Sequence, residues 1–155
     1  MRLLMILNLL MALSSAWAAT ADAAGTDAAT PAAPDRYAQA ILIYQALMAL
    51  DQANATGNYS VLRDLAAPEF QAGHTAAALA ESFAGYRRLN VALAPTVLFE
   101  PRLTAPASVT GAGQLRLTGY MPTRPLRIGF DISWRLVDGR WRLIGLAVTP
   151  TAAGR

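Results

Sequence analysis

A few acidic side chains and a single histidine are the groups that acid–base catalysis would require. His74 is the only histidine, and a lone histidine in a loop lies more often on the surface than in a catalytic centre. Glu69 follows a proline and Glu100 lies in a predicted strand, and we expect both carboxylates at the surface. Asp131 is the most suggestive carboxylate because large apolar residues flank it on both sides. We predict no catalytic residue, unless several of these groups converge in one cavity.

Metal and cofactor chemistry find little support in the residue types. The chain has no cysteine and one histidine, and its carboxylates are not clustered, so a metal site is not expected. No glycine-rich phosphate loop follows a predicted strand, and there is no Gly-x-Ser-x-Gly motif. The segment 111–113 (Gly-Ala-Gly) joins two predicted strands and is typical of a turn. We therefore predict no cofactor.

The stretch 126–148 is predicted to form a β-hairpin around which the rest of the chain packs. Apolar residues occupy every second position from 126 to 136, which is the period of a half-buried strand. Asp138-Gly139 favours a two-residue type I′ turn, which needs two positive φ angles. The turn predicts that Leu136 faces Trp141, that Trp134 faces Leu143, and that Phe130 faces Ala147. The inner slab would then contain Phe130, Ile132, Trp134, Leu136, Trp141 and Leu143.

The same register defines the outer face of the hairpin. Asp131 would point outward opposite Leu146, where a diagonal contact with Arg135 or Arg142 favours a structural role. A one-residue slip would exchange the two faces. An exposed apolar stripe on a sheet commonly marks an interface. The predicted interface consists of Arg135, Arg142, Ile144, Leu146 and Val148.

Helices are predicted upstream of the sheet. Asp35 can cap a first helix that begins near Arg36 and ends at 54–58, where Gly57 and two asparagines lie. Asn58 can cap a short second helix over 59–66, and a loop follows at 71–74. A third helix is predicted from 75 to about 93.

Strands follow the helices at 96–103 and 114–121, before the hairpin, so the fold class is α+β with an antiparallel sheet packed on helices. Aromatic residues at helical spacing are more often core than site, yet a mainly apolar pocket with a few polar tips would suit a ligand. The predicted ligand-pocket residues are Tyr37, Tyr44, Phe83, Tyr86, Phe130 and Trp134.

Residues 1–18 have the features of a signal peptide. Arg2 precedes an apolar run, and Ala16-Trp17-Ala18 matches a cleavage signature. An uncleaved N-terminal anchor is the alternative. Residues 19–34 lack large apolar side chains and are predicted to be a disordered linker, which leaves 35–150 as the domain. We expect a periplasmic or secreted protein, without a membrane segment beyond the export signal.

Charge does not indicate a nucleic-acid partner. The formal net charge of +3 is small, and its arginines are scattered. Arg116, Arg124 and Arg127 do concentrate near the second turn of the sheet, which is typical of a solvated edge and alternatively of a contact with an anion or an acidic partner.

The order of elements resembles the nuclear transport factor 2-like (polyketide cyclase-like) superfamily. The resemblance covers 35–149 and rests on three helices, four long strands, the segment 58–65 before Pro-Glu-Phe, and the ending Asp-Gly-Arg-Trp-Arg-Leu. It implies a cone-shaped, cystatin-like α+β roll, in which a curved antiparallel sheet of four or more strands wraps the helices and leaves a pocket at its open end. It also implies the option of a homodimer formed through the outer sheet face. The chain looks most like small exported bacterial members of unassigned activity.

Three functional hypotheses follow, in order of preference. The first is a non-catalytic exported domain that binds a small hydrophobic ligand or a partner protein. The second is an isomerase, dehydratase or cyclase acting on a hydrophobic substrate, as some members of the superfamily do. That hypothesis requires at least two of Tyr44, Tyr86, Glu69, His74 and Asp131 to meet in one cavity. The third is a structural or assembly module that works through the outer sheet face.

Overall fold

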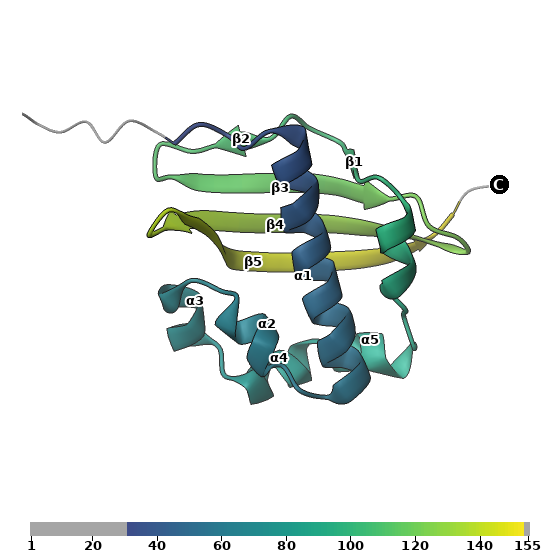
Figure 1. The fold of residues 1–155 in the computed structure, drawn as a ribbon. Coiled ribbons are helices and arrows are strands. Elements are labelled where there is room, and N and C mark those ends of the chain that lie inside the picture. Colours follow the sequence, from purple (N-terminus) through teal and green to yellow (C-terminus); the bar gives the residue numbers. More distant parts are fainter. Residues whose placement is uncertain (1–30, 154–155) are drawn as a thin grey trace, which may run out of the picture.

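The computed structural model describes residues 31–153 and has an α+β architecture with an antiparallel sheet of five strands. The predicted signal peptide and residues 19–30 of the predicted linker lie outside the described residues. No helix within 31–153 is long and apolar enough to cross a membrane. Figure 1 shows α1 (Arg36–Thr56) lying across the sheet, with α2 (Ser60–Asp64), α4 (Ala76–Ser82) and α5 (Ala84–Arg88) near its C-terminal half, whereas α3 (Pro68–Gly73) lies closer to β5 (Arg140–Ala152).

Helix α1 spans Arg36–Thr56, and its two ends are those predicted. The Asp35 side chain accepts a hydrogen bond from Ala38 N at 2.8 Å, which satisfies one free amide of the first turn. Gly57 ends the helix with φ of 74°, a left-handed conformation that costs glycine little. Buried residues along the helix pack against the sheet: Leu42, Ile43, Ala46, Leu47, Leu50 and Ala53.

The helices after α1 are shorter than predicted. Helix α2 spans Ser60–Asp64, and α3 spans Pro68–Gly73, so most of the expected loop at 71–74 is instead the last turn of a helix. The expected helix 75–93 is broken into α4 (Ala76–Ser82) and α5 (Ala84–Arg88).

The break in that helix has a local cause. The Ser82 hydroxyl donates to Ala78 O at 2.9 Å and Gly85 has low helix propensity, so the helix is weak at this point. Phe83 leaves helical geometry there, and its side chain is buried in the core.

The sheet has the order β1-β3-β4-β5, and β2 also pairs with β3. Its strands are β1 (Arg102–Leu103), β2 (Ser108–Val109), β3 (Gln114–Met121), β4 (Leu126–Val137) and β5 (Arg140–Ala152). The long strand predicted at 96–103 is wrong, because Ala94–Leu98 forms the 3₁₀ helix η1. Asp51 Oδ1 accepts hydrogen bonds from Leu93 N and Ala94 N, and the Thr96 hydroxyl donates to Leu93 O at 2.6 Å. These bonds hold the turn and leave only two residues for β1.

The β4–β5 hairpin forms with the predicted turn. Asp138 and Gly139 have φ of 49° and 73°, and Trp134 faces Leu143 as expected. A β-bulge then shifts the register, because Ser133 pairs with Gly145 and Ile144 is the extra residue.

The bulge corrects the predicted pairing beyond Leu143. Phe130 faces Val148 instead of Ala147, and Asp131 faces Ala147 instead of Leu146. Val148 is consequently 4% exposed within the core, and Leu146 packs against it. The predicted inner slab is buried except near the turn, where Leu136 is exposed and Trp141 is half-buried.

The outer edge of β5 is hydrogen-bonded to the helical part of the chain. Ala67 N donates to Leu143 O at 2.8 Å, and Leu143 N donates to Leu65 O at 3.3 Å. Further along the strand, the Tyr86 hydroxyl donates to Val148 O. The loop between α2 and α3 and the side chain from α5 thereby fix the helices against the sheet.

Candidate functional site

A hollow lies between the first half of α1 and the segment 100–107. Its volume is about 880 Å³, and it is open to solvent. Figure 1 shows the N-terminal half of α1 on the β1–β2 side of the sheet. The lining of this groove is mainly apolar, with a few charged groups: Arg36, Tyr37, Gln39, Ala40, Ile41, Ile43, Tyr44, Glu100, Pro101, Arg102, Leu103, Pro106 and Ala107.

Helix α1 supplies one wall through residues that share a helix face. Tyr37, Ile41 and Tyr44 follow one another at spacings of four and three residues, which places them in one row. Tyr37 is 77% exposed and Ile41 is 47% exposed, so much apolar surface remains uncovered. The Tyr44 hydroxyl donates to Phe99 O at 2.8 Å and joins α1 to the chain leaving η1. Burial, and secondarily the charge of Glu100, raises the pKa of Tyr44.

The opposite wall depends on a close approach between β1 and β3. Leu103 pairs with Gly119, and a Cβ atom at Gly119 would lie 2.2 Å from Arg102 O. Only glycine leaves room for the β1 backbone at that distance. Thr104 N donates to Thr118 O at 3.0 Å and continues the pairing. The position of β1, and with it the groove wall, therefore requires glycine at 119.

The groove contains charged groups that are not used inside the fold. Arg36 and Arg102 line it together with Glu100, and within residues 31–153 none of the three forms an ion pair. The ion pairs of that region join other residues: Arg63–Asp64, Arg116–Asp131 and Arg135–Glu69.

The six predicted pocket residues do not share one cavity. Tyr37 and Tyr44 line the groove, whereas Phe83, Phe130 and Trp134 are buried in the core, and the Tyr86 hydroxyl bonds to backbone on β5. Sequence reasoning placed all six along faces that meet the sheet, and this was too coarse to separate core from groove.

Sequence reasoning also missed part of the groove lining. Ile41 had a usable signal, since it lies on the same stripe as Tyr37 and Tyr44. Arg36 and Arg102 had none, because their proximity depends on where β1 pairs.

The two acidic candidates on or near the sheet are engaged in separate ion pairs. Asp131 accepts from Arg116 Nε at 2.9 Å and from the Thr118 hydroxyl at 3.2 Å, in place of the predicted contact with Arg135 or Arg142. Hydrogen bonding to Arg116 lowers the pKa of Asp131 below its ordinary value, against a smaller opposing effect of burial. Glu69 accepts from Arg135 Nη1 at 2.5 Å.

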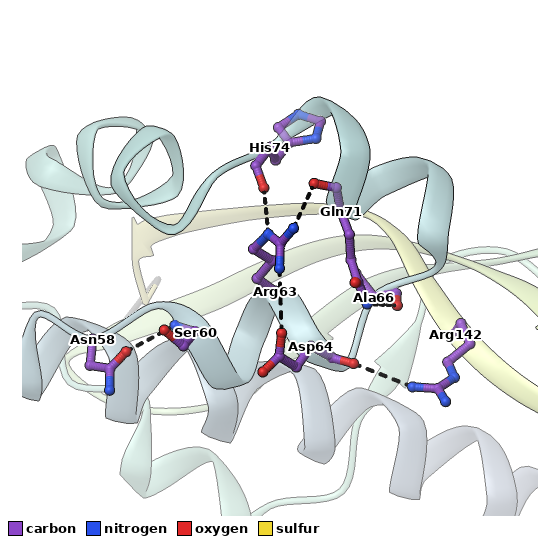
Figure 2. Close-up of polar contacts among 8 residues, drawn as sticks. All are labelled: Asn58, Ser60, Arg63, Asp64, Ala66, Gln71, His74 and Arg142. Atoms are coloured by element: carbon purple, nitrogen blue, oxygen red, sulfur yellow. Dashed lines mark hydrogen bonds and ion pairs between the residues drawn. The ribbon is translucent and has the colours of Figure 1, made fainter.

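His74 belongs to a structural network around Arg63. Figure 2 shows the Arg63 guanidinium donating to His74 O at 3.0 Å and to Gln71 O at 3.1 Å, beside Asp64. The His74 ring stacks on Phe70, with its Nδ1 2.9 Å from Phe70 O. These contacts hold the ends of α3 and α2 together, and they use the histidine as a structural element.

The outer sheet face differs from the predicted interface. After the bulge, Val148 is buried and Leu146 packs on the core, so Ile144, Leu146 and Val148 do not form an exposed stripe. Arg135 pairs with Glu69, and Arg142 donates to Asp64 O at 3.3 Å, as Figure 2 shows for Arg142. The continuous exposed stripe on which the interface prediction rested is therefore not present within residues 31–153, and self-association stays a prediction.

A shallower hollow of about 420 Å³ does lie on that outer face. Its lining contains the Arg116–Asp131 pair together with Ser133, Gly145 and Leu146. Of the arginines near the second turn, Arg127 lies over the Tyr120 ring at 4.9 Å. Within the hollow, the charges of Arg116 and Asp131 neutralise each other.

Neither metal ligation nor a known relative identifies the site. Within the described part of the chain, no group of three or more His, Cys, Asp or Glu residues is arranged to hold a metal ion. In comparisons with known proteins, no family model, no curated protein and no solved structure matches this chain. The groove between α1 and 100–107 is the feature that combines volume, exposed apolar surface and unpaired charge.

Proposed function

We propose that this chain is an exported, non-catalytic domain that binds a small hydrophobic ligand in the groove between α1 and the segment 100–107. The observation that carries the proposal is the groove itself, with a volume of about 880 Å³ and a wall of aromatic and aliphatic side chains. Ligand pockets in proteins have volumes of about 300–1,000 Å³ and combine apolar walls with a few polar groups. Tyr37 and Ile41 gain cover when such a ligand binds.

A binding role is favoured over catalysis by the separation of the polar candidates. An enzyme of the type considered above would bring at least two of them to one reacting centre. In the structure, Glu69 and Asp131 pair with different arginines, and His74 stacks on Phe70. The hydroxyls of Tyr44 and Tyr86 donate to backbone carbonyls of different segments.

A partner protein is the second candidate for the same region. Val97 and Leu98 in η1 are exposed, Leu98 by 79%, and the next residue, Phe99, accepts a hydrogen bond through its backbone oxygen from Tyr44 of the groove. Contiguous apolar surface on a folded domain commonly marks an interaction site. A protein that covers both η1 and α1 would give the domain a role in assembly.

The proposal includes export and membership of the nuclear transport factor 2-like superfamily. Export is supported by the charge, apolar run and Ala-x-Ala signature of residues 1–18. Family membership is supported by the order of elements, with helices first and a meander of three long strands last. Intact mass of protein recovered from the periplasm of an expression host tests export, because cleavage after Ala18 removes 18 residues.

Native mass spectrometry of that periplasmic protein tests the binding role. We expect a discrete extra mass that denaturation releases. Ile41→Asp places a charge in the groove wall and should abolish the extra mass. Val61→Asp is the matched control, because Val61 is exposed on α2 and does not line the groove. Bare wild-type protein would overturn ligand binding, and an extra mass retained by Ile41→Asp would overturn its assignment to the groove.

A further inference from the structure

We propose that the ligand of the groove is an amphiphile with an anionic head group, held by Arg36 and Arg102 while its apolar chain lies along α1. This inference rests on the proposed function and adds the chemical class of the ligand. It follows from two features of the same groove, namely the unpaired guanidinium groups and the exposed apolar row.

The two arginines come from different elements and meet at one groove. Arg36 is the first residue of α1 and Arg102 the first residue of β1, and both line the hollow. Neither takes part in an ion pair within residues 31–153. A guanidinium presents donors in a planar fork that matches the oxygens of carboxylate, sulfate or phosphate. Two such groups beside apolar surface are complementary to an anion that carries an apolar chain.

The apolar residues along α1 form the surface on which the hydrocarbon chain of the ligand would lie. From Arg36 the face of α1 continues through Tyr37, Ile41 and Tyr44, and Leu103 lies on the opposite wall. Because the groove is open to solvent, a head group can remain hydrated at the rim while the chain is covered. Burial of that chain supplies affinity in proportion to the apolar area removed from water.

Glu100 limits the charge that the groove accepts. Its carboxylate lines the same hollow, and its charge contributes to the raised pKa of Tyr44. Two guanidinium groups and one carboxylate leave a net single positive charge, which suits a singly charged head group. Glu100→Gln is therefore expected to increase affinity for an anionic amphiphile.

Isothermal titration with three ten-carbon amphiphiles, each below its critical micelle concentration, tests the inference. The probes are decanoate, decanol and decyltrimethylammonium. We expect decanoate to bind about tenfold or more tightly than the other two, since a hydrogen bond to a charged group commonly changes affinity by that factor. Added salt should weaken decanoate binding and leave decanol binding unchanged.

Variants separate this inference from the proposed function. The double variant Arg36→Gln/Arg102→Gln should weaken decanoate binding about tenfold or more and leave decanol binding unchanged. Arg140→Gln is the control, because Arg140 is exposed at the distant β4–β5 turn. Equal affinity for the three head groups, or an unchanged decanoate affinity in the double variant, would overturn the anionic class and leave the groove intact as a binding site. Failure of all three amphiphiles to bind would overturn the proposed function itself.

Discussion

Replacing Gly119 with alanine should destabilise the fold by displacing β1. The added Cβ would lie 2.2 Å from Arg102 O and 2.9 Å from Leu103 Cα, and both neighbours are backbone atoms that cannot rotate away. Relief of this overlap requires β1 to move off β3. The pairing lost includes the Thr104 N to Thr118 O hydrogen bond.

The magnitude can be worked from those contacts. Forcing an extra methyl group into a packed site costs about 1–3 kcal/mol. If β1 instead moves away from β3, about two hydrogen bonds of the ladder are lost, which costs about 2 kcal/mol and lies within the same range. A loss of about 2 kcal/mol corresponds to a fall in melting temperature of roughly 8 °C for a domain of this size.

Gly145→Ala is the matched control on the outer face. A Cβ there would lie 3.6 Å from Ser133 Cβ, which is ordinary van der Waals contact. Glycine inside a strand is about 0.5–1 kcal/mol less favourable than alanine, so this variant should be as stable as the wild type or slightly more stable.

Thermal unfolding followed by circular dichroism, with amide exchange at Thr104, provides the assay. The expected result is a lower melting temperature and faster Thr104 exchange for Gly119→Ala alone. A Gly119→Ala protein that melts within about 1 °C of the wild type and keeps Thr104 protected would show that β1 is not held against β3 in this way.

Three further predictions concern other parts of the fold. Val148→Thr buries a hydroxyl in the core and should lower the free energy of unfolding by about 1–2 kcal/mol. Ala147→Thr, on the outer face, should change it by less than about 0.5 kcal/mol. Urea denaturation of the two variants measures the difference. The folded-state pKa of Asp131 is lowered, so its contribution to stability is present above the unfolded pKa and is lost as pH falls through the folded value. Asp131→Asn should therefore flatten acid denaturation below the unfolded pKa of about 3.9, and the effect should be small because the pair is largely exposed. Arg63→Met removes the donors to Gln71 O and His74 O and should accelerate hydrogen exchange at the end of α3, and unchanged exchange there would contradict the role of this network.

The features predicted from the sequence are those that depend on neighbouring residues. Asp35 and Gly57 mark the two ends of α1, because a capping residue forms its hydrogen bond with the helix that it begins or ends. Asp138-Gly139 determines the position of the hairpin turn, because a primed turn matches the twist of the two strands. Strand β3 was likewise predicted with its bounds, since its alternation continues over eight residues.

The errors arise where distant contacts decide between local alternatives. With an unshifted register, Gly145 and Ala147 would face the core and Leu146 and Val148 would face solvent. The bulge at Ile144 reverses this: Val148 becomes buried, which is worth about 1.5–3 kcal/mol, and Leu146 becomes partly buried against the core. Nothing in the strand's own sequence marks the bulge, because the gain appears only once α1 covers the face. The same dependence on distant contacts hid the groove, whose second wall exists only when β1 crosses Gly119.

The bonds along the outer edge of β5 have a consequence for the behaviour of the protein in concentrated solution. An edge strand with free N–H and C=O groups invites a strand from another molecule, which is a route to aggregation. Here Leu143 and Val148 already bond to Leu65, Ala67 and Tyr86. At the opposite edge, the part of the chain that the structure describes has only the two-residue strands β1 and β2. A second molecule could extend the sheet at β5 only by first displacing these contacts, so the fold discourages strand-to-strand polymerisation without any disulfide bond.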